Sequence, residues 1–104
     1  MYDFSISCTG INCFRSTNLI RDVTKIAKKV PVVFGELGER DCAAVFVTPV
    51  MDWADQQGWS YLGWSWNTAS CSTFPALISN YDGTPTAFGL GFRTHFAELN
   101  AKRG

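Results

Sequence analysis

The spacing of apolar residues predicts three helices, over residues 17–29, 43–57 and 85–102. Pro31 ends the first helix, because proline lacks the amide donor that a helix requires. Gly58 ends the second, because glycine readily adopts the left-handed conformation found after helices. In chain order, the apolar positions of the three helices are Leu19, Ile20, Val23, Ile26 and Ala27; Val45, Phe46, Val50, Met51 and Trp53; and Phe88, Phe92, Phe96 and Leu99.

Pro49 falls inside the second predicted helix, where its missing N–H and its ring disfavour helical backbone. Two arrangements accommodate it. Either the helix begins at this point, with Thr48 as the cap and Pro49 in the first turn, or the helix starts earlier and kinks at the proline.

Two segments have the character of strands. Residues 30–34 are a continuous, mostly β-branched apolar run, which is typical of a strand buried on both faces of a parallel sheet. Residues 59–66 predict a second strand, rich in aromatic side chains. Polar loops follow the two strands, over residues 35–41 and 67–85, and residues 1–15 indicate a further loop because their apolar positions alternate only weakly.

The predicted order is helix, strand, helix, strand, helix, which favours an α/β fold with parallel strands and right-handed crossovers. A chain of 104 residues is long enough for one modest core. Two strands alone cannot form a stable parallel sheet, because both faces of such a sheet need cover. We therefore expect two α/β units of something larger, which copies of the chain could complete by self-association.

Charge and hydropathy exclude some classes of partner. Nine basic and nine acidic side chains cancel, so nothing in the net charge favours a nucleic acid or an anionic membrane. No apolar run approaches the roughly 20 residues of a membrane-spanning helix. Met1 does not begin a basic and then apolar leader, so we expect a secretory signal to be either absent or already removed.

The four cysteines are Cys8, Cys13, Cys42 and Cys71, and none forms a C-x-x-C pair. Since His95 is the only histidine, a zinc site is poorly supported, and nothing suggests another metal or an organic cofactor. Two disulfides in a secreted protein fit better. Of the three possible pairings we favour Cys8–Cys13, which flanks a short turn, with Cys42–Cys71, whose members each follow a predicted strand and so share one rim of the sheet.

The candidate chemistry lies at the ends of the two strands. Glu36 follows the first, and Trp64, Trp66 and Asn67 stand at the end of the second, where parallel barrels carry their functional groups. In glycoside hydrolysis a carboxylate attacks the anomeric carbon, and a neighbouring indole face can pack under the sugar ring. The alternative is that Glu36 is simply the first solvated residue of a loop.

Two further carboxylates follow in the same loop. Glu39 and Asp41 are candidates for the functional acid, although their places deeper in the loop predict that both are solvated. The aromatic content of 14%, with four tryptophans, also has two interpretations. Composition alone favours core packing, and the other interpretation is a platform on which sugar rings stack.

Residues 31–39, Pro-Val-Val-Phe-Gly-Glu-Leu-Gly-Glu, resemble the seventh-strand motif of glycoside hydrolase family 5, a family of cellulases and mannanases. The glutamate of that motif is the family's nucleophile and is Glu36 here. Residues 61–67, Tyr-Leu-Gly-Trp-Ser-Trp-Asn, resemble the eighth strand, whose tryptophan floors the subsite at the cleavage point. Trp64 fits that role, and Trp66 is the second choice.

Two shorter segments add to the resemblance. Residues 81–87, Tyr-Asp-Gly-Thr-Pro-Thr-Ala, are similar to the turn into the family's final helix. Tyr2 is similar to the tyrosine of a His-x-Tyr motif that follows the sixth strand. The resemblance implies that residues 1–104 are a single C-terminal segment of a (β/α)8 TIM barrel, running from about its sixth helix to its eighth.

The implied activity is hydrolysis of β-1,4 bonds in cellulose or a related glucan by retaining double displacement, without a cofactor. Glucan, mannan and mixed-linkage glucan all stay open as substrates. Asn67 and Glu39 are expected to contact neighbouring sugars. We expect His95, on the last predicted helix, to be a surface or core residue.

One part of the family's machinery is missing from the sequence. A retaining enzyme needs a second carboxyl about 5–5.5 Å from its nucleophile. The family carries this group in an Asn-Glu-Pro motif, and the present sequence has no such tripeptide. Two alternatives to an active enzyme therefore stay open: a non-catalytic fragment that binds glucan through Trp64 and Trp66, and a barrel piece that self-associates into a homo-oligomer.

Overall fold

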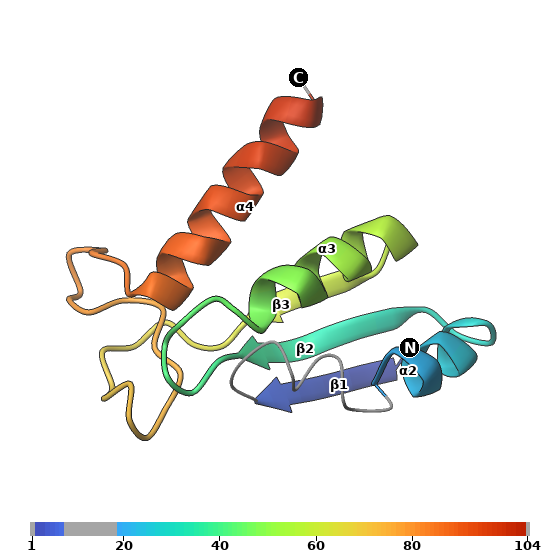
Figure 1. The fold of residues 1–104 in the computed structure, drawn as a ribbon, viewed down its shortest axis with the longest axis horizontal. Coiled ribbons are helices and arrows are strands. Elements are labelled where there is room, and N and C mark those ends of the chain that lie inside the picture. Colours follow the sequence, from blue (N-terminus) through green and yellow to red (C-terminus); the bar gives the residue numbers. More distant parts are fainter. Residues whose placement is uncertain (1, 8–18, 104) are drawn as a thin grey trace.

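The computed structural model describes residues 2–7 and 19–103, with side chains from residue 21 onward. Strands and helices alternate along the chain, so the molecule is a small α/β protein, as the sequence pattern predicts (Figure 1). The elements are β1 Tyr2–Ser7, α2 Leu19–Ala27, β2 Val32–Gly38, α3 Val47–Gln57, β3 Ser60–Gly63 and α4 Ala87–Arg103.

The three strands form one parallel sheet in the order β1-β2-β3. Parallel pairing of the two predicted strands, β2 and β3, is confirmed. The prediction of a loop over residues 1–15 is wrong for residues 2–7, which form β1. A short segment with weak alternation becomes a strand here because β2 supplies partners for its backbone N–H and C=O groups.

Strand β2 continues to Gly38, beyond the predicted end at Phe34. Two residue steps along β1 and along β3 correspond to three steps along β2, so β2 carries one extra residue at Gly35–Glu36, a β-bulge. The bulge returns Leu37 to the buried face of Phe34 and leaves Glu36 exposed. The pairs that define the register are Asp3–Val33, Ser5–Glu36, Phe34–Tyr61 and Leu37–Gly63.

Helix α3 begins at Val47, so Pro49 lies in its first turn, which confirms the first of the two predicted arrangements. The start at residue 43 is wrong, and the N-cap is Phe46 rather than Thr48. Proline is tolerated in the first turn because the first amides of a helix have no partner within the helix. At the other end, Gly58 has φ of 73° and its N–H reaches the carbonyls of the last turn, which confirms the predicted C-terminal cap.

The helices pack on one side of the sheet. Phe34 of β2 meets Trp53 of α3 and Trp59 at ring-centroid distances of 6.0 and 6.2 Å. Core packing therefore accounts for two of the four tryptophans. The buried cluster comprises Val23, Val32, Phe34, Leu37, Cys42, Phe46, Val47, Val50, Met51, Ala54, Ala76, Phe88 and Phe92.

Helix α4 begins at Ala87. Its N-terminal half packs into the core through Phe88 and Phe92. Gly89 makes this approach possible. A Cβ atom at residue 89 would stand 1.8 Å from the carbonyl oxygen of Leu77. The loop and the helix therefore meet backbone to backbone at this position.

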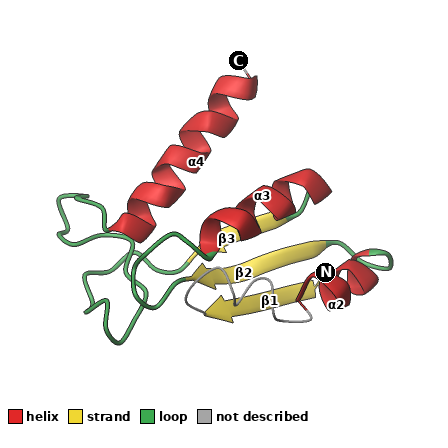
Figure 2. Cartoon of the chain, in the orientation of Figure 1, coloured by secondary structure: helices red, strands yellow, loops and turns green. Residues whose placement is uncertain are grey.

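Strand β3 ends at Gly63, earlier than the predicted end at residue 66. Its backbone pairing extends one residue further, because the N–H of Trp64 donates to the carbonyl of Leu37 at 2.9 Å. The chain then turns away through a cis peptide bond between Trp64 and Ser65. The loops that follow β2 and β3 emerge at the same end of the sheet (Figure 2).

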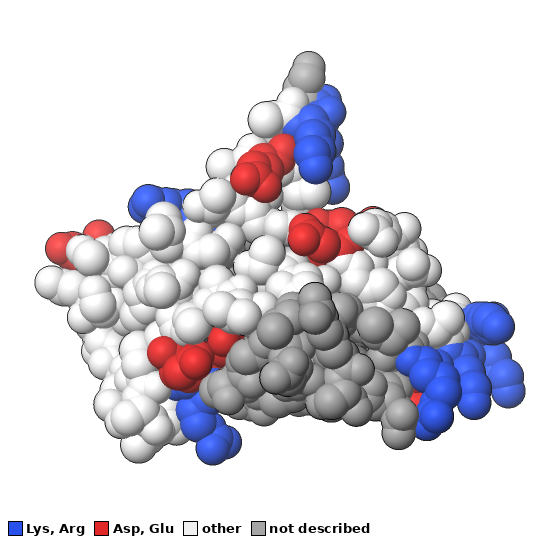
Figure 3. Space-filling view, viewed as in Figure 1, with Lys and Arg blue, Asp and Glu red and all other residues white. Residues whose placement is uncertain are grey.

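A group of basic side chains lies at the end of the molecule opposite these loops (Figure 3). In Figure 3 lysines and arginines gather near α2, where Arg21, Lys25, Lys28 and Lys29 are exposed. The group is therefore remote from the carboxyl ends of the strands. No helix within residues 2–7 and 19–103 is long and apolar enough to cross a membrane.

Candidate active site

Glu36 lies on the bulge near the end of the central strand, and its side chain is exposed. The flanking residues Phe34 and Leu37 are both fully buried on the helix side. The carboxylate therefore belongs to the opposite side of the sheet, which we call the open face. β-Bulges near the ends of strands commonly redirect a functional side chain in this way.

Trp64 belongs to the same face. Along β3, Tyr61 and Gly63 contact helix α4, so the alternating residues Leu62 and Trp64 point the other way. Both are exposed, Leu62 at 60% and Trp64 at 43%. The structure thus brings the predicted nucleophile and the predicted tryptophan to one face and one end of the sheet.

The backbone fixes this juxtaposition. The carbonyl that accepts the hydrogen bond from Trp64 belongs to Leu37, the residue directly after Glu36. A carboxylate and an indole on adjacent parallel strands can bind a sugar ring from two sides. The carboxylate would face the anomeric carbon, and the indole would face the apolar C–H surface of the ring.

Glu39 has a different place from the one expected. Its side chain is fully buried, and Oε2 accepts hydrogen bonds from the N–H groups of Phe46 at 2.8 Å and Val47 at 3.3 Å. The expectation that Glu39 is solvated is wrong, because the first turn of α3 offers unpaired amides and the positive end of the helix dipole. We assign it to the helix start rather than to a sugar.

Asp41, the second alternative acid, is exposed as expected. Its Oδ1 accepts the N–H of Ala43 at 3.0 Å, which is a local turn in the loop after β2. Between the three carboxylates of this segment, only Glu36 is both exposed and part of the sheet. That combination makes it the best placed of the three for chemistry on a bound sugar.

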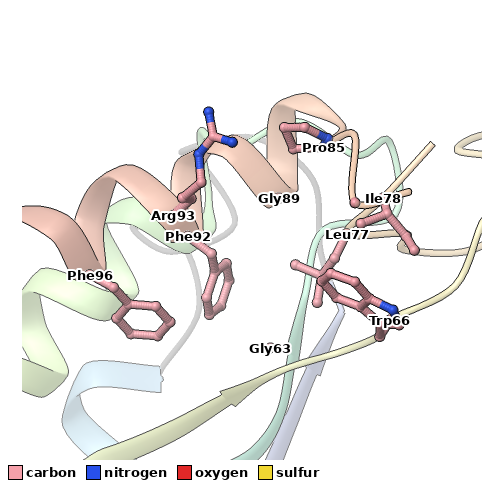
Figure 4. A pocket seen from close by; sticks show the side chains of 10 residues that line it. Gly63, Trp66, Leu77, Ile78, Pro85, Gly89, Phe92, Arg93 and Phe96 are labelled. Carbon is pink, nitrogen blue, oxygen red and sulfur yellow. The ribbon is translucent and has the colours of Figure 1, made fainter. Parts of the chain in front are cut away.

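Trp66 is 64% exposed but contributes to a different surface. It lines a pocket of about 320 Å³ between the free edge of β3 and helix α4 (Figure 4). Phe92 and Phe96 of α4 line the same pocket, together with Leu77 and Ile78. Trp66 therefore takes no part in the arrangement around Glu36, and Trp64 is the better candidate for the sugar subsite.

The remaining predicted contacts are less well placed. Asn67 uses its amide locally, since Oδ1 accepts the N–H of Ala69 at 2.8 Å and Nδ2 donates to Ser65. Tyr2 lies within β1 and pairs with Val32, at the opposite end of the strand from the Ser5–Glu36 pair. The expected position of Tyr2 after a strand is therefore wrong. Tyr2 lies three residues before Ser5 along β1, and each residue of a strand adds about 3.3 Å, so Tyr2 is distant from Glu36.

The disulfide between Cys42 and Cys71 is present, with the two Cα atoms 5.3 Å apart. It joins the loop after β2 to the loop after β3, as their predicted position on one rim requires. Cys8 and Cys13 lie outside the described residues. A Cys42–Cys71 bond favours an oxidising compartment.

Sequence reasoning missed a hydrogen-bonded group on the helix side. His95 is buried, and its Nε2 lies 2.6 Å from Oδ2 of Asp55, whose Oδ1 accepts the Tyr61 hydroxyl at 2.8 Å. Burial raises the pKa of Tyr61 above its usual range, and the hydrogen bond to Asp55 raises it further. The three residues join α4, α3 and β3, and no periodicity in the sequence indicates this contact.

The sequence also gave no reason to single out Phe74. Its ring is 37% exposed and packs against Trp64 with the ring centroids 6.5 Å apart.

Within residues 2–7 and 19–103, no group of three His, Cys, Asp or Glu side chains is placed to hold a metal ion. Comparisons with protein-family models, with curated proteins and with solved structures found no match to this chain.

Proposed function

We propose that this chain is part of the catalytic barrel of a retaining β-1,4-glycanase, and that Glu36 is its nucleophile. The observation that carries the proposal is the placement of Glu36 and Trp64 on one open face, at the carboxyl ends of neighbouring parallel strands. The resemblance of residues 31–39 and 61–67 to two strands of family 5 supports the same roles. In this assignment β1, β2 and β3 correspond to the sixth, seventh and eighth barrel strands.

The chemistry follows from the position of one carboxylate. An oxygen of Glu36 attacks the anomeric carbon, the bond from that carbon to the leaving oxygen breaks, and a glycosyl ester forms. The leaving oxygen takes a proton from a second carboxyl group, and water then releases the sugar from Glu36. The sequence has no Asn-Glu-Pro motif for that second carboxyl, so no residue of this chain is assigned as the proton donor.

The proposed substrate is a β-1,4-linked polysaccharide of the cellulose type, and no residue assigned here separates glucan from mannan. We propose that the protein acts outside the cell. The Cys42–Cys71 disulfide supports this, since such bonds persist in oxidising compartments.

A labelling experiment tests the nucleophile without the missing acid. A dinitrophenyl β-cellobioside with fluorine at carbon 2 of the reacting sugar has a leaving group that needs no protonation, and the fluorine slows release of the glycosyl ester. We expect the wild-type chain to gain the mass of one fluorinated disaccharide, on the peptide that contains Glu36. The Glu36→Gln variant should remain unlabelled.

Glu98→Gln supplies the matched control, because Glu98 is an exposed glutamate on α4. It should label like the wild type. Labelling that persists in Glu36→Gln, or that maps to Asp41, would overturn the assignment of the nucleophile.

A second candidate function is glucan binding without cleavage. Exposed aromatic side chains at the strand ends favour it, and the absent proton donor is worth about 10²–10⁴-fold in rate. Binding of cellotetraose by a chain that never labels at Glu36 would support this alternative.

Self-association, the third candidate, is favoured by Leu62, an exposed leucine on the open face. A concentration-dependent mass in sedimentation, lost in Leu62→Gln, would support it.

A further inference from the structure

The loop after β3 holds an exposed phenylalanine on a firmly anchored backbone. Cys71 is bonded to Cys42, and the Sγ of Cys42 also accepts the N–H of Ala76 at 3.4 Å. The loop is thus attached on both sides of Phe74. Ala76 is fully buried, whereas Phe74 leaves 37% of its surface exposed beside Trp64.

Close packing against β2 adds a third attachment. A Cβ atom at Gly38 would stand 2.9 Å from the carbonyl oxygen of Trp64 and 3.0 Å from the ring of Pro75. Gly38, at the end of β2, therefore packs directly against Pro75 and against the backbone of Trp64. These contacts set the position of both aromatic rings relative to the strand that carries Glu36.

An exposed aromatic pair on a fixed backbone is a feature of binding surfaces. The two rings are inclined at 59°, so they form a corner rather than a flat stack. Both rings leave apolar surface exposed to water, and covering that surface is favourable. A ligand with apolar faces would cover them instead, as the C–H faces of a pyranose do.

We propose that Trp64 and Phe74 form an aromatic corner that binds two successive sugar rings of the chain cleaved at Glu36. This inference rests on the proposed function and adds a subsite to it. Trp64 takes the reacting sugar, and Phe74 takes its neighbour. The rings are inclined at 59°, so each presents its face to a different sugar.

The disulfide is a positioning device for this subsite. It holds the loop that carries Phe74 against the loop after β2, and the carbonyl of Phe74 lies 3.8 Å from the Sγ of Cys42. Neither cysteine needs to touch the sugar. Removal of the disulfide should therefore weaken sugar binding through Phe74 alone.

The experiment measures binding of cellotetraose to the full chain by intrinsic tryptophan fluorescence or calorimetry. Phe74→Ala should weaken binding about five- to tenfold, the usual effect of losing one aromatic contact. Tyr81→Ala is the matched control, since Tyr81 is an exposed aromatic residue in the same loop without a ring partner on Trp64. It should leave the affinity unchanged.

A double-mutant cycle tests the role of the disulfide. The paired substitution Cys42→Ala and Cys71→Ala should weaken binding as much as Phe74→Ala does, and adding Phe74→Ala to it should cause no further loss. If the paired variant does not fold, the Phe74→Ala and Tyr81→Ala comparison still decides the proposal, because both positions are on the surface.

The outcomes separate this inference from the proposed function. Unchanged affinity in Phe74→Ala, or equal loss in Tyr81→Ala, overturns the aromatic corner even if Glu36 becomes labelled. Absence of any cellotetraose binding by the wild type overturns it too. Binding that depends on Phe74 in a chain that never labels at Glu36 supports the corner and overturns the nucleophile.

Discussion

Two glutamates three positions apart have opposite environments, and the backbone decides which is which. Glu36 is exposed on the bulge of β2, whereas Glu39 is fully buried at the start of α3. Both follow the same apolar run, so their residue type and spacing do not distinguish them. The difference comes from α3, whose first amides need an acceptor that only the second glutamate can reach.

Replacement of these two residues should therefore affect stability differently. Glu39→Ala leaves the amides of Phe46 and Val47 without their acceptor inside the protein, and we expect a loss of about 1–3 kcal/mol in unfolding free energy. Glu36→Ala should change it by less than about 0.5 kcal/mol. Urea denaturation of both variants checks the difference, and equal losses would contradict the buried role of Glu39.

Tyr61 gives the fold a dependence on alkaline pH. Because burial and Asp55 raise its pKa in the folded state, the folded protein holds the phenolic proton at pH values where the unfolded chain has lost it. The stabilisation is complete below the unfolded pKa of about 10 and declines as the pH rises above that value. We expect the unfolding free energy to fall there.

The variant Tyr61→Phe isolates this effect from the titration of lysines. Its unfolding free energy should decline less steeply than that of the wild type between about pH 10 and pH 12. Tyr81→Phe, on the surface, should follow the wild type. Parallel curves for Tyr61→Phe and the wild type would contradict the assignment.

At the scale of the elements, the close approach of α4 to the preceding loop depends on the absence of a Cβ atom at Gly89. Gly89 places helix backbone against the carbonyl of Leu77, and the N–H of Thr86 also donates to that carbonyl at 3.1 Å. Phe88 and Phe92 enter the core on either side of this contact. The glycine therefore determines how closely α4 can pack.

The substitution Gly89→Ala reverses the usual effect of alanine in a helix. Alanine in place of glycine normally stabilises a helix by about 0.5–1 kcal/mol. Here the Cβ would overlap backbone, so we expect a loss of about 1–3 kcal/mol. Thermal denaturation beside Asn100→Ala, an exposed position of α4, checks the sign. A stabilised Gly89→Ala protein would contradict the close approach.

The order of helices and parallel strands could be predicted from periodicity, since it depends on residues that are near one another in the chain. Strand β1 could not, because its stability comes from pairing with β2 rather than from its own weak alternation. The start of α3 depends on Glu39, and the ends of β2 and β3 depend on a bulge and on the turn after Trp64. Contacts between distant residues settle these boundaries.

The residues of the candidate site, too, could be predicted only in part. Glu36 and Trp64 could be predicted because each follows a strand, and parallel strands bring their ends together. Trp66 and Tyr2 could not be placed without the register. Phe74 lies in a loop whose course depends on the Cys42–Cys71 bond, so its contact with Trp64 has no signal in the local sequence.

At the scale of the whole molecule, one disulfide joins the two loops that follow β2 and β3. It closes 29 residues that include the whole of α3 and β3. The helix side of the sheet is covered by the core cluster, while the open face exposes Leu62 and Trp64. The bond thus strengthens a fold in which, among the residues whose side chains are described, the large buried surface lies on the helix side of the sheet.

Loss of the disulfide should weaken the entire fold. The paired variant Cys42→Ala and Cys71→Ala should lose about 2–4 kcal/mol in unfolding free energy, because a loop of this length is no longer constrained in the unfolded chain. Urea denaturation measures the loss, with Thr68→Ala in the same loop as the control. A loss no larger than that of the control would show that the bond is not part of the stabilising framework.

The bulge in β2 makes one position in the strand tolerant of a length change. Deletion of a residue from a regular strand exchanges its two faces from that point on. Deletion of Gly35 would instead leave Phe34 and Leu37 on the buried face, since the extra residue already interrupts the alternation. Glu36 would then alternate between Phe34 and Leu37 and stay on the open face, so a chain that is one residue shorter here keeps both faces of the strand. The length of the strand can change at this point without exchanging the buried and exposed faces.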